Sequence, residues 1–385
     1  MPVKSPTLYR LAADRRYGDI PDRVDSHPSD LFWTDRYGST ALHILCQART
    51  VDPDLLKAVD AILENAPELT SWPNVATWTP LHFAVERRLL WGEEEEIAAN
   101  EASSSFTSPT TALILRLLRA CPSAVSLRTR SGYKTKTPFH IACEAAADYR
   151  VLKAMLSINP ELATEPFVKR DPYANIENPL QLLWKAHLHL AGTRTREIIP
   201  PRAERNMALL LKAAFTGSVR RRKGGQQPAF FILHAACSVR TPRDYFSHIL
   251  SQNLPDVSVK DENDYLPLHH AVRSAISSDS VAYTQYVLEA LLKVFPKAAE
   301  IPLGPLQRLP LHVAVADSYL TWHKGGLNSL ALAHVGALRA VDPESGLLPF
   351  LVSAEAAIKS RMHLSTTYEL LRIAPEAAQI CRSYH

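Results

Sequence analysis

Histidine and cysteine recur in this 385-residue sequence within one repeated pattern, and both side chains bind metals or act in catalysis when they are grouped. Three of the six patterned histidines are followed three residues later by a cysteine. The set comprises His43, His82, His140, His234, His269 and His312, with Cys46, Cys143 and Cys237. Successive histidines lie 35 or more residues apart, and the sequence holds no C-x-x-C pair of the kind that zinc sites use. We therefore expect no catalytic residues, no metal site and no cofactor.

The segments around these histidines predict helix starts. The fullest example is Thr137–Cys143, with near-copies at Thr40–Cys46 and Thr79–Val85. Thr at the N-cap can accept a hydrogen bond from an unpaired backbone N–H, and Pro at the first helical position loses no bond that the helix needs. The other copies are Ile232–Cys237, Leu266–Val272 and Leu309–Val315, and Asn178–Gln181 and Leu348–Leu351 keep the apolar frame without the histidine.

This pattern resembles the T-P-L-H-x-A signature of ankyrin repeats. Asp35–His43 matches the longer D-x-x-G-x-T-P-L-H frame except at the Pro, and Asp261–His269 matches it with Asp264 in place of Gly. The resemblance implies an all-α fold, an ankyrin-type solenoid of stacked helix pairs with hairpin-like finger loops. It also implies that each histidine orders its repeat by bonding the Thr hydroxyl and the adjoining backbone. Where Leu266 and Leu309 replace the Thr, this role stays open.

The anchor positions are 35 to 58 residues apart, more than the ~33 of the family, so we expect the excess in loops. We expect one array over residues 1–385, with roughly nine helix pairs. It would comprise an N-terminal cap unit (1–30), central repeats (31–347) and a C-terminal cap unit (348–385). Loop insertions are expected near 92–110, 191–206 and 216–229.

Amphipathic runs that end at a Pro turn predict the second helix of each pair. These runs are Asp54–Glu64, Thr111–Ala120, Tyr149–Ile158, Tyr245–Gln252, Ser280–Val294 and Ser365–Ile373. The turn that follows reads P-x-x-A or P-x-x-L, in place of the family's G-A-D-V-N. We expect the Pro to stop the helix and stiffen the exit towards the next finger.

Composition narrows the class of protein and the cellular location that we expect. A hydrophobic content of 46% with 21% charged residues is typical of an ordered globular chain, and a net charge of +4 gives no general attraction to nucleic acid or membranes. Residues 1–10 lack the apolar core of a signal peptide, and no run approaches the length of a membrane span. We expect a cytoplasmic location, with a nuclear one open, no membrane partner and a monomer.

The resemblance implies a non-catalytic scaffold or adaptor that binds another protein through its concave finger and inner-helix surface. Partner contacts in the family lie at fingertips and on the exposed side of the first helix, where aromatic and Arg side chains make strong anchors. By spacing, the candidates are Arg36, Tyr37, Trp72, Trp78, Arg87, Tyr133, Lys134, Lys136, Tyr265 and Arg273. The same spacing also places Ser39, Phe230 and Arg308 at fingertips. We expect the main contact on the first three fingers, around Trp78.

Two alternatives remain. Arg128, Arg130, Lys134 and Lys136 in one finger, together with Arg220–Lys223, would suit a nucleic-acid-associated adaptor. The run Arg220–Lys223 also resembles a nuclear localisation signal. An enzyme would need a nucleophile or metal cluster assembled from separate repeats.

Overall fold

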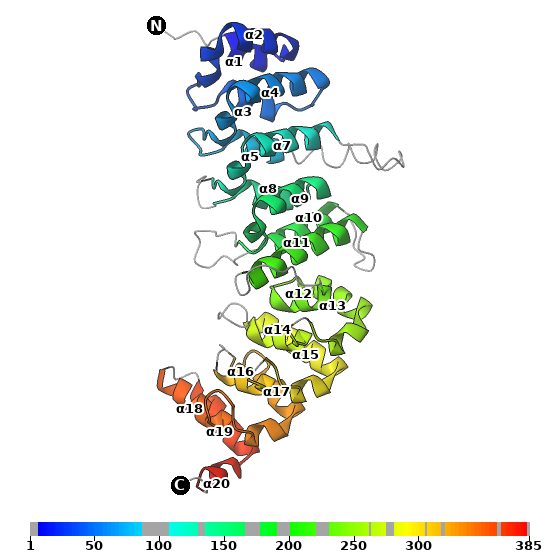
Figure 1. Cartoon of the computed structure of the whole chain (residues 1–385), viewed down its shortest axis with the longest axis vertical. Coiled ribbons are helices and arrows are strands. Elements are labelled where there is room, and N and C mark those ends of the chain that lie inside the picture. Colours follow the sequence, from blue (N-terminus) through cyan, green and yellow to red (C-terminus); the bar gives the residue numbers. More distant parts are fainter. Residues whose placement is uncertain are drawn as a thin grey trace. The chain divides into compact units, whose positions relative to one another are not determined.

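The computed structural model describes most of the chain. The described ranges are 7–86, 108–129, 135–165, 178–190, 201–220, 231–261, 263–274, 281–304, 306–316, 320–359 and 363–382. Over these ranges the chain forms α-helices and short 3-10 helices, which confirms the predicted all-α class (Figure 1). None of the helices in the described ranges combines the length and the hydropathy that a bilayer span requires.

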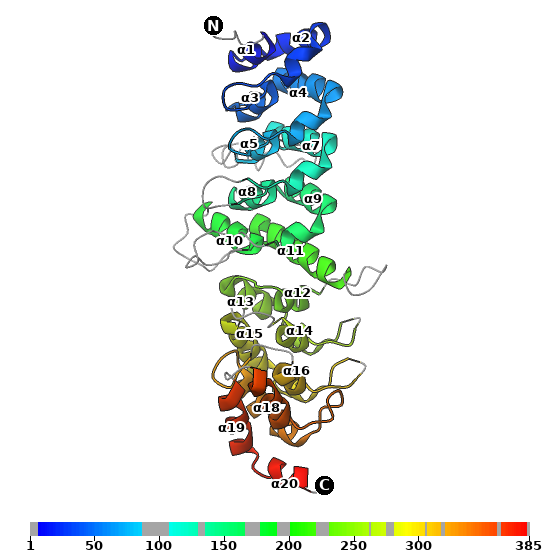
Figure 2. The same ribbon diagram turned by 90° about the vertical axis from the view of Figure 1, so that its left-hand side faces the viewer.

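The chain divides into two compact units, Met1–Gly217 (unit 1) and Ser218–His385 (unit 2). In unit 1 the first helices of successive pairs stack on one another and the second helices stack beside them (Figure 2). The pairs are α1 (Thr7–Ala13) with α2 (Ile20–Ser26), α3 (Ala41–Gln47) with α4 (Pro53–Asn65), α5 (Pro80–Glu86) with α7 (Pro109–Ala120), α8 (Pro138–Glu144) with α9 (Tyr149–Ile158), and α10 (Pro179–Leu190) with α11 (Pro201–Arg220).

Unit 2 repeats the arrangement, and its first helices again pack on one another in chain order. The pairs are α12 (Ile232–Ser238) with α13 (Arg243–Gln252), α14 (Pro267–Arg273) with α15 (Val281–Val294), α16 (Pro310–Ala316) with α17 (Leu327–Ala333), and α18 (Pro349–Lys359) with α19 (Leu364–Ile373), followed by α20 (Ala377–Arg382). The expectation of one uninterrupted array over the whole chain stays a prediction.

Five of the six predicted Pro turns form one short 3-10 helix after a second helix, and the sixth, at Pro375, leads into α20. Examples are Pro67–Ser71 after α4 and Pro122–Ser126 after α7. The residue two positions after the Pro is buried each time, as in Leu69, Ala124 and Val257. The Pro therefore ends the helix, and the small or apolar residue that follows closes the core beneath the next finger.

Helix α11 corrects part of the predicted loop insertions, because residues 201–206 and 216–220 are helical. Pro201 and Gly217 lie in the predicted insertions, and both residue types often break a helix. Pro201 instead occupies the first helical position, and Ala203, Met207, Leu210 and Ala214 recur at helical spacing on a buried face. Residues 92–107, 191–200 and 221–229 of the predicted insertions lie outside the described residues.

Helix α17 has no counterpart among the predicted second helices. It has only seven residues and follows Gly325 and Gly326, both with positive φ (91° and 81°). The 3-10 helix after it, Val335–Arg339, also lacks the Pro that marks the other exits.

Candidate protein-binding surface

The patterned histidines first bond within their own repeat. In each full copy of the motif, Nδ1 accepts a hydrogen bond from the backbone N–H three residues earlier. The donors are Thr40 to His43 (3.0 Å), Thr79 to His82 (3.2 Å), Thr137 to His140 (3.3 Å), Leu266 to His269 (3.0 Å) and Leu309 to His312 (3.3 Å). The three Thr hydroxyls also lie within 2.9 Å of Nδ1, which confirms the predicted Thr–His contact. Where Leu replaces Thr, the backbone bond alone persists.

The other ring nitrogen reaches the following repeat. Where Nδ1 accepts, Nε2 carries the proton and donates to a main-chain oxygen. In His234, Nε2 makes the same contact although Nδ1 has no hydrogen-bond partner among the described residues. The pairs are His43 to Trp78 (3.2 Å), His140 to Glu165 (3.1 Å), His234 to Val259 (3.1 Å), His269 to Ile301 (3.0 Å) and His312 to Ala340 (3.0 Å). These histidines are therefore ties between repeats.

Burial fixes the charge of these rings. Loss of hydration lowers the pKa of His43, His82, His234 and His269 to about 4, so they are neutral at pH 7. A neutral ring with one nitrogen accepting and the other donating matches the bonds of His43 and His269, whereas His82 Nε2 and His234 Nδ1 have no hydrogen-bond partner among the described residues.

The repeat at Pro179 lacks the histidine and keeps the same bond pattern at its helix start. The Asn178 N–H donates to Gln181 Oε1 (3.0 Å), and the Gln181 N–H donates to Asn178 Oδ1 (2.9 Å). This reciprocal pair is a capping box built from amides, so the apparent loss of the motif is a substitution by residues of equivalent hydrogen-bonding capacity.

The fingers are fixed by side-chain acceptors before any partner arrives. In finger 1 (residues 35–39), Asp35 Oδ1 accepts from the backbone N–H groups of Tyr37 and Ser39, both at 2.8 Å. In finger 2 (residues 74–78), Asn74 Oδ1 accepts from the Trp78 N–H at 2.9 Å. The Val75 N–H then donates to the Tyr37 carbonyl at 2.8 Å, which joins the two fingers directly.

One residue in the left-handed backbone conformation completes the turn of each of two fingers. Gly38 in finger 1 has φ +73°, and a Cβ there would lie 3.2 Å from the Val75 nitrogen, so the close approach of the fingers favours glycine. Asp264 takes the same conformation in its own finger, at φ +62°, as expected from its tolerance of this region.

A groove of about 370 Å³ lies between fingers 1 and 2 and helix α3. Its lining residues are Asp35, Tyr37, Ser39, Ile44, Gln47, Asn74, Val75 and Ala76. Tyr37 is 55% exposed and Val75 is 76% exposed. Large apolar side chains held in the open beside a groove are typical of protein-recognition surfaces.

Four predicted residues lie in or beside these two fingers. Arg36 and Tyr37 are exposed, with the guanidinium 4.6 Å from the ring centre. Trp72 is 38% exposed and its ring lies 6.1 Å from that of Phe32. Trp78 is half-buried, because its ring packs on Phe83 at 5.0 Å.

The remaining predicted residues lie elsewhere. Lys136 pairs with Glu144, and both are partly buried. In unit 2 the Arg273 guanidinium lies 5.2 Å from the centre of the half-buried Tyr265 ring and donates to its hydroxyl (3.2 Å). Arg87, Tyr133 and Lys134 lie outside the described residues, as do Phe230 and Arg130.

Arg308 and Ser39 are corrections to the fingertip spacing rule, because both are buried. Arg308 donates from Nε and Nη2 to the two oxygens of Asp342, each at 2.8 Å, and also pairs with Glu344. This bidentate ion pair joins two successive fingers.

Sequence reasoning missed Val75, Asn74 and Phe32 as parts of the surface. A signal for Asn74 was present, since it stands in finger 2 where Asp35 stands in finger 1 and binds the backbone in the same way. The same alignment places Val75 in finger 2. The position of Phe32 depends instead on a tertiary contact, the packing of its ring against Trp72.

No protein-family model and no curated protein matches the sequence. Among solved structures, the chain is similar to one from the complex of the predatory endopeptidase Bd0816 of Bdellovibrio bacteriovorus with immunity protein Bd3460. That similarity has 15% identity and a TM-score of 0.29, over 76% of this chain and 98% of that chain. An ankyrin repeat protein from Leishmania major is similar at 16% identity and a TM-score of 0.29, over 77% of this chain and 86% of that chain. The histidine ties, helix pairs and fingers of the described residues form an ankyrin-like repeat fold.

Proposed function

We propose that this chain is a non-catalytic protein-interaction scaffold that binds a partner protein at fingers 1 and 2. The observation that carries the proposal is the groove beside Tyr37 and Val75, with both side chains exposed above it. The fingers are already fixed by Asp35, Asn74 and the bond between them, so binding would cost little ordering entropy.

The groove suits an apolar side chain on an extended partner segment. Ile44, Val75 and Ala76 supply apolar lining, and the Tyr37 ring supplies a rigid anchor with a polar hydroxyl. Gln47, at the end of α3, places an amide at the same groove, where it can bind the backbone of such a segment.

A role for the third finger in nucleic-acid binding receives less support. Among its described basic residues, Arg128 pairs with Glu165 and Lys136 pairs with Glu144. A phosphate would have to displace these carboxylates, so the two cations offer little free charge.

Crosslinking followed by affinity measurement tests the proposal. A photoreactive amino acid at position 75 should crosslink the partner, and its identity would follow from mass spectrometry. With the purified partner, Tyr37→Ala and Val75→Asp should each weaken binding by about tenfold or more, as for anchor residues at other interfaces.

The matched control is Tyr368→Ala, because Tyr368 is 66% exposed in unit 2. It should leave the affinity unchanged, and circular dichroism should show that all three variants remain folded. Wild-type affinity in both finger variants would place the contact elsewhere and contradict the proposal.

A further inference from the structure

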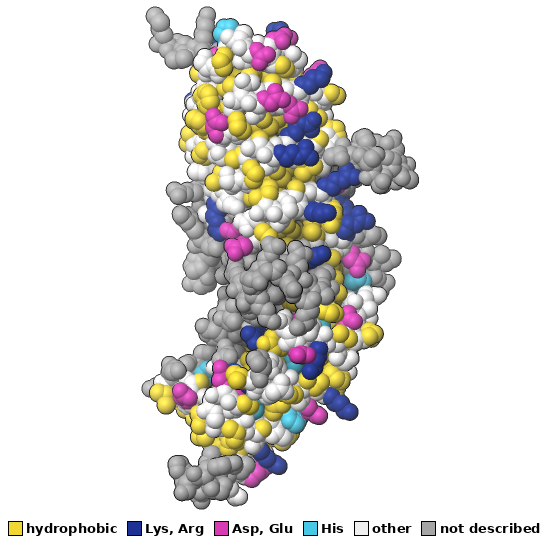
Figure 3. Space-filling model, viewed as in Figure 1, with side chains coloured by type: hydrophobic (Ala, Val, Ile, Leu, Met, Phe, Trp, Pro, Cys, Tyr) yellow, Lys and Arg dark blue, Asp and Glu magenta, His cyan; other side chains and the backbone are white. Residues whose placement is uncertain are grey.

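Helices α7 and α9 carry a charge pattern that the finger surface does not explain. Between them they contain Arg116, Arg119, Arg150 and Lys153 and no Asp or Glu. The two helices pack side by side. Figure 3 shows Lys and Arg side chains gathered along the edge of unit 1 where Figure 1 places α4, α7 and α9. We call these four residues the basic patch.

The side chains of the basic patch reach solvent to different degrees. Arg119 and Lys153 are exposed, and the Lys153 ammonium lies 5.9 Å from the centre of the Tyr149 ring. Arg116 donates from Nε to Asp60 Oδ1 at 2.8 Å while 32% of its side chain stays exposed. Arg119 has no ion pair among the described residues. Two exposed cations and a partly open guanidinium are therefore available for an anionic partner.

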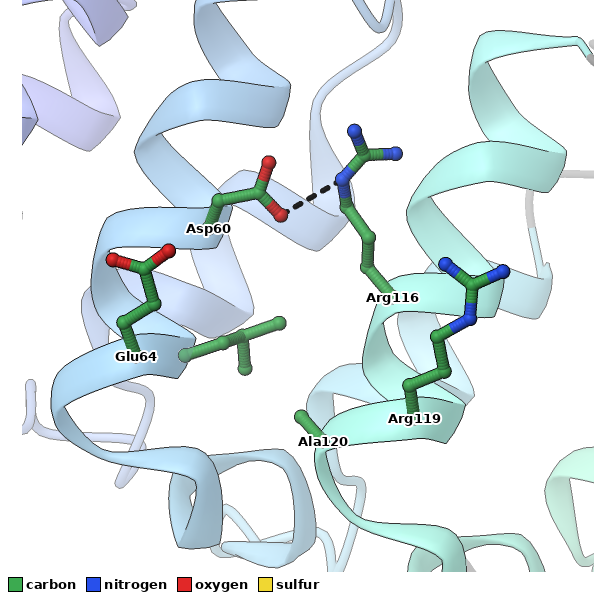
Figure 4. Close-up of a pocket in the computed structure, with 6 residues that line it drawn as sticks. Asp60, Glu64, Arg116, Arg119 and Ala120 are labelled. Atoms are coloured by element: carbon green, nitrogen blue, oxygen red, sulfur yellow. Dashed lines mark hydrogen bonds and ion pairs between the residues drawn. The ribbon is translucent and has the colours of Figure 1, made fainter.

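A groove of about 510 Å³ borders the patch between α4 and α7. Leu63 and Ala120 contribute apolar surface to it. Figure 4 shows the carboxylates of Asp60 and Glu64 on the α4 side and the guanidinium groups of Arg116 and Arg119 on the α7 side. Ile158, at the end of α9, adds an apolar side chain that is 37% exposed.

The apolar surface decides between an acidic peptide and a nucleic acid. Three of the four cations are Arg, whose planar fork binds a carboxylate or a phosphate through two parallel hydrogen bonds. Asp60 and Glu64 at the border disfavour any continuous line of anions. The apolar surface of Leu63, Ala120 and Ile158 matches the apolar face of an amphipathic peptide, whereas a phosphate backbone leaves it unused.

We propose that the basic patch is a second protein-binding surface, which takes an acidic amphipathic segment of a partner protein. Within unit 1 it lies on the second helices, whereas the finger groove lies beside α3, a first helix (Figure 2). The two surfaces can therefore be occupied independently, so this proposal stands apart from the finger groove.

The probe is a fluorescent helical peptide of alternating Glu and Leu pairs, and the readout is fluorescence anisotropy with the full chain at low salt. Arg119→Glu/Lys153→Glu should weaken binding by about tenfold or more, because two attractive charge pairs become repulsive. The same peptide with Lys in place of Glu should bind this double variant better than it binds the wild type. Tyr37→Ala should bind the acidic peptide as the wild type does.

Lys293→Glu/Lys297→Glu is the matched control in unit 2. It makes the same change in net charge, and Lys293, like Arg119, lies exposed in the last turn of its helix. Equal losses in the two double variants would mean that net charge alone attracts the peptide, which would overturn the proposal. Tighter binding of a single-stranded oligonucleotide, lost in the Arg119/Lys153 variant, would also overturn it, because the patch would then be a nucleic-acid site.

Discussion

At the scale of single residues, the patterned histidine acts twice, as an acceptor at its own helix start and as a donor to the next repeat. The amide pair of Asn178 and Gln181 shows that the first task can be done without an imidazole. The imidazole does both tasks at once, because Nδ1 accepts while Nε2 donates. This division explains why the histidine recurs in repeats whose other residues differ.

Stability should fall when the solution is acidified from about pH 7 to about pH 5. The pKa of His43, His82, His234 and His269 is lowered to about 4 by burial, while the unfolded chain titrates near 6.5. Between these values the unfolded state binds more protons, so the free energy of unfolding decreases as the pH falls. The loss should reach several kcal/mol in total, at about 1.4 kcal/mol per pKa unit and group.

Urea unfolding at a series of pH values measures this loss. Carboxylates with ordinary unfolded pKa values titrate below this window, so they leave the histidine effect separate. A free energy of unfolding that stays constant from about pH 7 to about pH 5 would contradict the neutral, buried state of the rings.

At the scale of elements, six of the second helices were predictable to within two residues at either end. Tyr149–Ile158 is α9 itself, because an amphipathic run and the Pro after it specify both ends locally. The two ends of α11 were predicted as loops, but the helix is continuous. The helical spacing of the buried Met207 and Leu210 outweighs the breaks that Pro and Gly suggest. The helix signal there is spread over many residues, whereas the break signals are local.

The sequence predicted which fingers carry the candidate residues, but it did not predict which of their side chains point to solvent. Tyr37 is exposed on the finger where spacing placed it, while Trp78 packs on Phe83 and Arg308 turns inward to Asp342. The partner of Arg308 lies 34 residues away in the sequence, in the next finger. Spacing within one repeat cannot reveal a contact of that kind.

Leu268→Ala should lower the free energy of unfolding by about 2–5 kcal/mol, the usual loss for a buried leucine. Leu268 is 1% exposed, so its side chain lies in the core. Leu254→Ala is the control in the same unit, because Leu254 is 49% exposed. Equal urea midpoints for Leu268→Ala and the wild type would contradict a core role for this position.

At the scale of the whole molecule, the chain consists of two compact units whose repeats contact mainly their neighbours. In such arrays a local defect spreads by nearest-neighbour coupling. The buried cysteines report on this behaviour, since Cys143 lies in unit 1 and Cys237 in unit 2, both 0% exposed. Burial raises the pKa of both thiols well above the ordinary value, so native labelling should be slow.

Leu268→Ala should therefore speed the labelling of Cys237 and leave that of Cys143 unchanged. Helix α14, which carries Leu268, packs directly on α12, which carries Cys237. Timed reaction with a thiol reagent, followed by mass spectrometry of the peptides, measures both rates in one sample. Equal acceleration at the two cysteines would mean that the units open together.

The acceptor of each histidine tie is a main-chain oxygen, and this choice bears on how the surface can evolve. The residues that provide the oxygen are Trp78, Glu165, Val259, Ile301 and Ala340, which share no side-chain property. A substitution at such a position changes the side chain and leaves the main-chain oxygen of the tie in place. The side chains at these positions can therefore vary in evolution while the stacking of the repeats is inherited unaltered.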